Sequence, residues 1–228
     1  MGERFARVLD DAGAAVVLTA RRAERLERLA SELHDAIWLA GDIADPQHRV
    51  ALMRMVEQHH GRLDVLVNNA AINDNGPLEE QSLEDLTSVI DVNLVALMDL
   101  CRLASPLLFA SEHASVVNVG SMYGVVASRG PMAAYNATKG AVVNFSRHLA
   151  AQWGSKGVRV NTLAPGYFPS EMTGELDGGF GRAIVQRTLL ARVPKVEELD
   201  GPLLFLASDA SSYVTGHTLV VDGGWTAV

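Results

Sequence analysis

The sequence predicts an α/β protein with a doubly wound parallel sheet and helices on both of its faces, in three layers. Short apolar, β-rich runs alternate along the chain with helical segments, and these runs are apolar on both sides. Strands of this kind are buried on two faces, as in parallel sheets whose connections are helices. The 228 residues contain no linker, repeat or low-complexity tract, so we expect one domain over residues 1–228.

The expected elements follow one another from residue 3 to residue 223. Phe5, Val8 and Leu9 have helical spacing, and Gly13 suits the end of that first helix. Ser82 opens the longest helix, with an acidic residue three positions on, as in a capping box. Strands are expected at 14–19, 36–40, 63–69, 115–120, 158–165 and 217–223. Helices are expected at 3–11, 26–33, 50–56, 82–110, 133–153 and 197–207.

Charge and composition exclude several classes of protein. The formal net charge is −8 and no basic block occurs, so the electrostatic signature of nucleic-acid binding is absent. The apolar runs are too short to span a bilayer, and the N-terminus lacks the apolar segment of a secretory signal. We therefore expect a cytoplasmic protein with no membrane partner. Cys101 is the single cysteine and His59-His60 has no further ligands at zinc spacing, so we expect no metal site.

Tyr135 and Lys139 stand four residues apart in the 133–153 helix. This spacing places both side chains on one helix face, one turn apart. A phenol has a pKa of about 10, and a nearby ammonium favours the phenolate, which brings that pKa toward the range of a general acid or base. An amphipathic surface pair would show the same spacing, so the neighbouring segments must decide between the two interpretations.

Further polar residues stand near the ends of predicted strands. Ser121 follows one strand and lies fourteen residues before Tyr135. Asn69 ends the preceding strand, and Asn93 lies within the long helix that follows it. Parallel strands present their carboxyl ends at one edge of an open sheet, where ligands bind. A serine at this edge can donate a hydrogen bond to a substrate carbonyl, which favours an active site.

With these motifs in this order, the sequence resembles the short-chain dehydrogenase/reductase family in its single-domain form, over essentially the whole chain. The resemblance implies that Tyr135 is the catalytic acid/base. It implies that Lys139 lowers the pKa of the tyrosine and holds the nicotinamide ribose. Ser121 would steady the substrate oxygen, and Asn93 would anchor a water in the proton relay. The spacing from Ser121 to Tyr135 is one residue longer than the commonest family pattern, and the extra residue falls in the 125–132 loop.

The same resemblance implies a dinucleotide site along the sheet edge. Asp42 matches the aspartate that accepts from the adenine amino group, with Ile43 stacking beside it, although Asp42 is equally placed to cap a helix. Asn69 matches the strand-end asparagine near the cofactor ribose. The segment after the 158–165 strand matches the lining of the nicotinamide, with a serine where a threonine usually bonds the carboxamide: Gly166, Phe168 and Ser170.

The residues after the 14–19 strand bear on the choice between NAD and NADP. An acidic residue there would bind the ribose 2′-hydroxyl, whereas an arginine accommodates a 2′-phosphate. The chain has Ala20-Arg21-Arg22 and no acid, and two arginines at a helix start oppose the helix dipole unless an anion binds. We expect NADP(H), with Arg21 at the phosphate. NAD(H) with a solvated arginine pair is the alternative.

The expected fold lacks a strand at its start. Each helix of a doubly wound sheet connects two parallel strands, yet no strand precedes the first helix here. In the family, a strand and a glycine-rich loop come before this helix, and Gly2 is the one candidate for that loop's last glycine. The family's strand order puts this strand between the 14–19 and 63–69 strands, whose backbone groups its loss would leave unpaired. We expect residue 1 to be internal to a longer natural protein, with a damaged relative as the alternative.

The resemblance implies reversible hydride transfer between NADP(H) and a carbonyl or secondary alcohol, such as a 3-oxoacyl thioester, a sugar acid or a ketone. The main alternative is a non-catalytic binding or scaffold protein that has lost its dinucleotide loop. A related enzyme for dehydration or epimerisation is a second. We expect the 171–195 segment and the loop at 123–132 to shape the substrate site. Broad apolar arcs on the 82–110 and 133–153 helices lead us to expect a homotetramer or homodimer.

Overall fold

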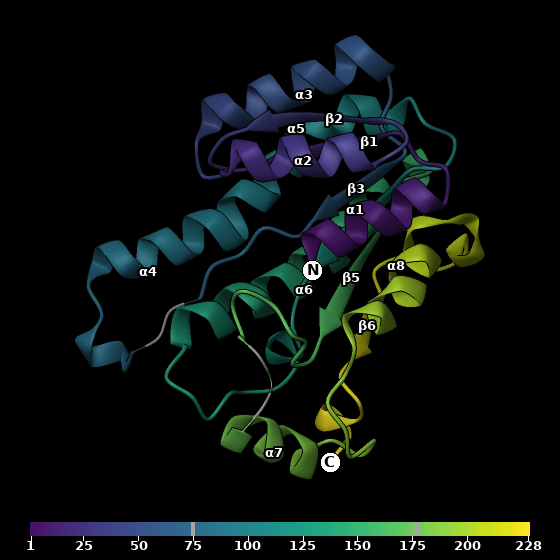
Figure 1. The fold of residues 1–228 in the computed structure, drawn as a ribbon. Coiled ribbons are helices and arrows are strands. Elements are labelled where there is room, and N and C mark those ends of the chain that lie inside the picture. Colours follow the sequence, from purple (N-terminus) through teal and green to yellow (C-terminus); the bar gives the residue numbers. More distant parts are fainter. Residues whose placement is uncertain (74–75, 175, 177) are drawn as a thin grey trace.

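A computed structural model describes residues 1–73, 76–174, 176 and 178–228 and confirms the alternation of strands and helices (Figure 1). The α-helices in these residues are α1 (Gly2–Asp11), α2 (Ala23–Glu32), α3 (Pro46–His60), α4 (Leu83–Ile90), α5 (Ala96–Phe109), α6 (Ala133–Trp153), α7 (Gly178–Arg187) and α8 (Asp200–Ala207). The strands are β1 (Val16–Ala20), β2 (Ala36–Ala40), β3 (Val65–Asn68), β4 (Ser115–Val119), β5 (Arg159–Pro165) and β6 (Thr218–Val221).

The strands form two separate parallel sheets. β1 pairs with β2, from Val16 opposite Ala36 to Ala20 opposite Ala40. The other sheet has the order β3-β4-β5-β6. Among the described residues, β1 and β3 therefore each have a single strand neighbour. The interruption lies between β1 and β3, where the sequence predicts a missing strand.

Helices cover both faces of the sheets. Val116 and Val117 are neighbours in β4 and are both fully buried, in the cores on opposite faces of the sheet. α3, α5 and α6 pack on the face of Val116, and α1 and α8 pack on the face of Val117. α2 packs with α1 against β1. The predicted three-layer arrangement is therefore confirmed.

The long helix predicted over 82–110 begins at the expected capping box. The Oγ of Ser82 accepts from the backbone N–H of Asp85 at 3.0 Å, and the Asp85 carboxylate accepts from the Ser82 backbone N–H. One π-helical turn, Asp91–Val95, separates α4 from α5. By length and composition, Leu83–Phe109 could cross a membrane, and 44% of its most apolar window is buried inside the protein.

Several predicted bounds differ from the structure. β1 begins at Val16, and the two preceding alanines are exposed. β3 and β6 keep four residues each, because each lies at an edge of the four-stranded sheet and pairs with one strand. Leu33 follows α2 as its C-cap rather than lying within the helix. α7 was not predicted, because its glycine-rich sequence hides the helical pattern. Positions 175 and 177 of the 171–195 segment are outside the described residues.

Candidate active site

The carboxyl ends of β3, β4 and β5 lie at one edge of the four-stranded sheet. Asn69 follows β3 and Ser121 follows β4 at this edge. α6 runs past it and places Tyr135 in hydrogen-bonding contact with Ser121. Lys139, one turn further along α6, reaches the last residue of β4. The structure thus brings together three of the four predicted catalytic side chains.

Lys139 is a buried charged group. The residue is 2% exposed, and its Nζ donates a hydrogen bond to the Val119 carbonyl at 2.8 Å. The same atom lies 5.6 Å from the centre of the Tyr135 ring. Burial lowers the pKa of Lys139 to about 8, because apolar surroundings disfavour the charged form. Lys139 therefore releases its proton far more readily than an exposed lysine does.

Tyr135 has a different electrostatic environment from the one expected. Burial raises the pKa of the Tyr135 phenol, and the hydrogen bond with Ser121 acts against this shift. The expectation that Lys139 lowers this pKa is not met, because the ammonium lies over the ring and is held by the Val119 carbonyl. Ser121 is itself fixed in place: it is 7% exposed, and its Oγ accepts from the Tyr123 backbone N–H at 3.1 Å.

Asn93 lies in the π-helical turn between α4 and α5 and is 1% exposed. Its Oδ1 accepts from the Ile72 backbone N–H, and its Nδ2 donates to the Ile72 carbonyl, both at 2.8 Å. Nδ2 also lies 3.3 Å from the hydroxyl of Thr138, the residue before Lys139. Asn93 therefore ties the segment after β3 to the catalytic part of α6.

A hollow of about 2060 Å³ extends from this edge to the gap between β1 and β3. It exceeds the roughly 300–1,000 Å³ of ordinary ligand pockets, so it has room for a dinucleotide. The Oδ1 atom of Asn69 is buried there with no hydrogen-bond partner among the described residues, which leaves an acceptor for a ligand hydroxyl. Most of the predicted cofactor residues line this hollow: Arg21, Asp42, Ile43, Asn69, Tyr135, Lys139 and Ser170.

Two predicted cofactor residues do not line the hollow. A Cβ on Gly166 would lie 2.8 Å from the Cα of Asp222, so this glycine allows close packing against the segment after β6. Phe168 is 4% exposed and its side chain packs in the core with α1 and α8. The Phe168 side chain therefore lies outside the lining of the hollow.

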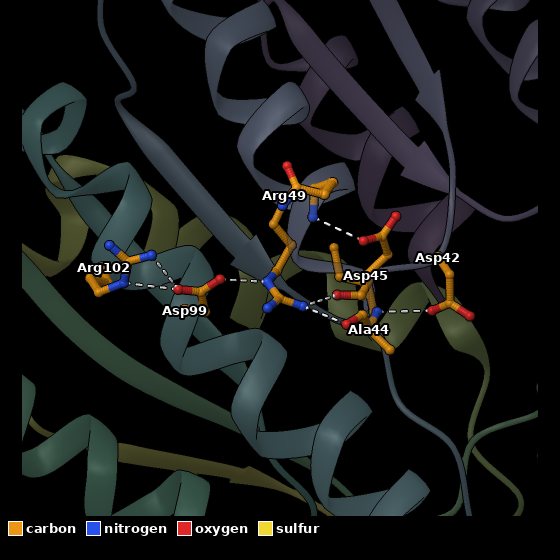
Figure 2. Close-up of polar contacts among 8 residues, drawn as sticks. Asp42, Ala44, Asp45, Arg49, Asp99 and Arg102 are labelled. Carbon is orange, nitrogen blue, oxygen red and sulfur yellow. Dashed lines mark hydrogen bonds and ion pairs between the residues drawn. The ribbon is translucent and has the colours of Figure 1, made fainter.

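A buried arginine holds the loop after β2 (Figure 2). Arg49 is 4% exposed, and its guanidinium donates to the carbonyls of Ile43 and Ala44 at 2.7 and 2.9 Å. Its Nε donates to Asp99 on α5 at 2.7 Å. Asp42 accepts from the Ala44 backbone N–H at 2.9 Å within the same loop. Arg49 thus fixes the predicted adenine-binding loop to the core.

The cap of α3 is Asp45, whose carboxylate accepts from the Gln47 backbone N–H at 2.9 Å. The alternative in which Asp42 caps a helix is therefore wrong. Asp42 instead shapes the turn that Arg49 holds. The sequence did not identify Arg49 as part of the site, because a single arginine in a helical pattern gives no sign that its side chain is buried.

Arginines at the start of α2 lie beside the hollow. Arg21, Arg22 and Arg25 line it, and the last two both donate to the carboxylate of Glu171. The Arg22–Glu171 distance is 2.8 Å. These hydrogen bonds hold the pKa of Glu171 below its usual range. The Glu171 carboxylate therefore already pairs with two of the three arginines beside the predicted phosphate position.

An aromatic cluster borders Tyr135. The hydroxyls of Tyr123 and Tyr167 lie 2.8 Å apart, and their rings meet edge to face. Tyr167 also packs against Trp225, and the Arg187 guanidinium lies 4.1 Å from the centre of the Trp225 ring. Burial and the Tyr123 hydroxyl raise the pKa of Tyr167. These residues come from distant segments, so no local pattern in the sequence could have revealed the cluster.

Within the described residues, no group of three or more His, Cys, Asp and Glu side chains could hold a metal ion. Cys101 is 1% exposed, and burial raises the pKa of its thiol to about 12, which makes it a poor nucleophile. The reactive groups at the sheet edge are therefore two hydroxyls and one amine, a set suited to proton transfer. This arrangement is typical of an enzyme that binds a nucleotide cofactor at the edge of an open α/β sheet.

Comparison with known proteins identifies the family of this chain. A family model described as enoyl-(acyl carrier protein) reductase matches residues 1–226. The chain is 37% identical to gluconate 5-dehydrogenase of Gluconobacter oxydans, over 99% of this chain and 90% of that protein. It is 34% identical to 3-oxoacyl-[acyl-carrier-protein] reductase of Bos taurus, over 98% of this chain and 92% of that protein.

Solved structures agree with these matches. A gluconate 5-dehydrogenase from Burkholderia cenocepacia, in complex with NADP and tartrate, has a TM-score of 0.91 and 35% identity, over 98% of this chain and 90% of that chain. A Serratia marcescens short-chain dehydrogenase/reductase variant has a TM-score of 0.92 and 29% identity, over 99% of this chain and 93% of that chain. This chain belongs to the short-chain dehydrogenase/reductase family and is an NAD(P)-dependent oxidoreductase.

Proposed function

We propose that this protein, acting as one domain over residues 1–228, transfers a hydride reversibly between NADP(H) and the carbonyl or secondary alcohol of a sugar acid. The observation that supports this best is the burial of Tyr135 and Lys139, one helical turn apart, in the lining of a hollow large enough for a dinucleotide. Buried groups with shifted pKa values mark functional sites.

The proton chemistry follows from the same residues. In the reductive direction, Ser121 and Tyr135 bind the substrate oxygen, and Tyr135 donates its proton to it. The Lys139 ammonium lies over the Tyr135 ring, and the Lys139 pKa of about 8 suits proton exchange near neutral pH. Asn93 holds the Ile72 backbone in place through two hydrogen bonds. In this position it would help to anchor the water of the proton relay. When bound, the nicotinamide supplies or accepts the hydride.

The cofactor would be held by residues along the hollow. Asp42 and Ile43 would bind the adenine, and Arg49 fixes the loop that carries them. Asn69 offers its buried Oδ1 to a ribose hydroxyl, and Lys139 offers its remaining N–H groups to the other ribose. The nicotinamide end has Ser170, with Gly166 and Phe168 contributing backbone alone.

NADP(H) is favoured over NAD(H) by the charges after β1. Arg21, Arg22 and Arg25 gather beside the hollow, and no acidic residue at the end of β1 is available for a ribose 2′-hydroxyl. The related gluconate 5-dehydrogenase from Burkholderia cenocepacia was solved with NADP. The 2′-phosphate would lie near Arg21 and would replace Glu171 as the partner of Arg22 and Arg25.

The aromatic cluster favours a hydroxylated, anionic substrate. The Tyr123–Tyr167 pair offers hydroxyl groups beside Tyr135, and Arg187 provides a cation at its far side, over Trp225. A sugar acid combines hydroxyls with a carboxylate, and gluconate is the substrate named for two of the relatives. A 3-oxoacyl thioester is the second candidate substrate, supported by the Bos taurus relative.

The interrupted sheet favours a second candidate function, a non-catalytic binding or scaffold protein. The gap between β1 and β3 opens directly into the hollow that would hold the cofactor. A chain that binds neither NADPH nor NADH could still bind a partner through this surface.

We also propose that the protein forms a homotetramer or homodimer in the cytoplasm. Several apolar side chains on and between α4 and α5 remain 41–79% exposed: Leu83, Ile90, Val95 and Met98. Apolar surface of this kind marks an interaction site. Light scattering on the purified chain would give the number of copies.

Enzymatic assay of the purified chain tests the proposed function. We expect NADPH-dependent reduction of 5-oxogluconate to a hydroxy acid that chromatography identifies, with slower reaction of acetoacetyl thioester and of NADH. Absence of binding of both NADPH and NADH would favour the non-catalytic binding or scaffold protein. Conversion of the thioester alone would overturn the sugar-acid assignment.

A further inference from the structure

The guanidinium of Arg187 lies over the ring of Trp225, with 4.1 Å between its Cζ and the ring centre. Arg187 ends α7, and Trp225 lies in the turn beside this helix, near the C-terminus (Figure 1). Trp225 is 7% exposed, so its indole is a fixed surface for the arginine. Stacking of this kind orients a guanidinium and leaves its N–H groups open to an anion. Within the described residues, no carboxylate or hydrogen-bond acceptor pairs with Arg187.

Two other arginines near α7 lack this combination. Arg192 already pairs with Glu198, at 2.5 Å. Arg182 is exposed on α7 five residues before Arg187, so it points to another side of the helix. The cation–aromatic contacts in the described part of the chain do not include it. Arg187 is therefore both oriented and available to an anion.

Tyr167 connects Arg187 with the groups around Tyr135. Its hydroxyl lies 2.8 Å from that of Tyr123, and its ring meets that of Trp225 edge to face. Burial and the Tyr123 hydroxyl raise the pKa of Tyr167, and the charge of Arg187 acts against this shift. From Arg187 through Trp225 and Tyr167 to Tyr123, the steps between centres are 4.1, 5.4 and 5.9 Å. A carboxylate on Arg187 is therefore several bond lengths from a carbonyl on Ser121 and Tyr135.

This separation restricts the shape of an acidic substrate. In a 2-oxo acid, the carboxylate is bonded directly to the reacting carbon and would lie beside the buried Ser121 and Tyr135, where an unpaired charge is costly. An acid whose carbonyl lies several carbons from its carboxylate can reach both ends of the site. Of the bonded Tyr123 and Tyr167 hydroxyls, one donates to the other, which leaves one O–H and two acceptor oxygens for hydroxyls on the carbons between.

We propose that Arg187 binds the substrate carboxylate, so that the protein selects polyhydroxy acids whose reacting carbonyl lies several carbons from the carboxylate. The planar guanidinium suits a carboxylate, because it can donate two parallel hydrogen bonds. This assignment rests on the proposed function for the reaction, and it adds the residue that distinguishes an acid from a neutral sugar. The site would disfavour two classes of carbonyl compound, the 2-oxo acids and the neutral ketoses.

Three carbonyl compounds test this specificity in NADPH oxidation assays. They are 5-oxogluconate, 2-oxogluconate and the neutral ketohexose that has a hydroxymethyl group in place of the carboxylate of 5-oxogluconate. Arg187→Met should raise the KM for 5-oxogluconate by about 10- to 100-fold, as loss of a hydrogen bond to a charged group does. The kcat should change little, because the contact is made equally in the ground state and the transition state. The KM for the neutral ketohexose should stay within twofold.

Two further variants separate this role from a structural one. Arg182→Met removes an exposed arginine from the same helix and should match the parent with all three compounds. Arg187→Lys keeps the charge and loses the planar fork, so its KM for 5-oxogluconate should lie between those of the parent and Arg187→Met. Calorimetry of gluconate binding to the full chain requires no turnover, and Arg187→Met should weaken this binding by a similar factor.

Several results would overturn the assignment of Arg187. They are an equal rise in KM for the acid and the neutral ketohexose, an equal effect of Arg182→Met, faster reduction of 2-oxogluconate than of 5-oxogluconate by the parent, and gluconate binding that is absent from the parent at millimolar concentration or unchanged in Arg187→Met. Gluconate binding that Arg187→Met weakens, in a parent that reduces no carbonyl with NADPH, would overturn the proposed function and leave the carboxylate site standing.

Discussion

The four-stranded and two-stranded sheets of this protein hold their functional side chains in different ways. Beside the four-stranded sheet, Asn93, Ser121 and Lys139 are at most 7% exposed, and each makes a hydrogen bond to a backbone group. Beside the two-stranded sheet, Arg22 and Arg25 are more than half exposed and share a carboxylate from the segment after β5. Core packing positions the catalytic groups, whereas surface contacts position the charges for the cofactor phosphate.

The order of the strands explains this difference. β4 and β5 have strand neighbours on both sides, so the positions at which the following segments begin are fixed. β1 and β3 border the gap and lack that support. Arg49 is the exception on the two-stranded side, because it is buried and ties the loop after β2 to α5 (Figure 2). We therefore expect large effects from substitutions beside the four-stranded sheet and at Arg49, and small effects at the exposed charges.

A large effect is expected at Ser121, with an upper bound below the one expected at Tyr135. Ser121→Ala removes a hydrogen bond to the substrate oxygen and should lower kcat by about 100- to 1,000-fold, as loss of an oxyanion donor does. The affinity for NADPH should stay unchanged. Ser212→Ala, at an exposed serine, is the matched control. Steady-state kinetics with a kcat within twofold of the parent would show that Ser121 does not touch the substrate.

Arg49→Met should weaken both the fold and the cofactor site. It leaves Asp99 with Arg102 as its remaining ion-pair partner, and it removes the donors to two loop carbonyls. Loss of one partner from a buried pair costs about 3–5 kcal/mol, which denaturant unfolding measures. The KM for NADPH should rise with little change in kcat.

Arg102→Met is the control for Arg49, because it removes the other partner of the same carboxylate. The Arg102 side chain is 69% exposed, so the free energy of unfolding should change by less than about 1 kcal/mol. Equal effects of the two substitutions on stability and on the KM for NADPH would contradict a special role for Arg49.

The burial of Lys139 predicts a pH dependence of stability. Its pKa is about 8 in the folded chain and 10.5 when unperturbed. Between these values the unfolded chain holds a proton that the folded chain has released, so the free energy of unfolding rises with pH. The gain is on the order of 3 kcal/mol. Lys139→Met should lose this rise in urea titrations between these pH values, and parallel curves for parent and variant would contradict it.

The smallest effect is expected at Glu171. Glu171→Gln removes the carboxylate that competes with a phosphate for Arg22 and Arg25. The affinity for NADPH should rise by no more than a few-fold, with no change in affinity for NADH, because NADH lacks the phosphate. Fluorescence titration measures both affinities. A change of the same size for both cofactors would place Glu171 away from the 2′-phosphate.

Local patterns predicted much of the fold. The observed bounds of β2 and α6 are those predicted, because the apolar run of β2 and the long helical pattern of α6 are continuous. The ends of β3 and β6 could not be predicted, since they depend on which strands lie beside them. The sequence predicted the interruption between β1 and β3, because no strand pattern stands before the residues of α1.

The sequence predicted the site in part. It placed Ser121, Tyr135 and Lys139 together, because strand ends and helical spacing determine their positions. It did not predict that Phe168 packs in the core, since side-chain direction after a strand depends on tertiary packing. The Tyr123–Tyr167 contact likewise could not be predicted from local patterns, because it joins residues 44 positions apart.

The assignment of Tyr135 as the proton donor is tested most directly by the rate of NADPH oxidation in a single turnover with 5-oxogluconate. Tyr135→Phe should lower this rate by about 100- to 10,000-fold and leave NADPH affinity unchanged, because general acid catalysis contributes a factor of this size. Tyr213→Phe, at a fully exposed tyrosine, should match the parent. A Tyr135→Phe rate equal to that of the parent would contradict the account.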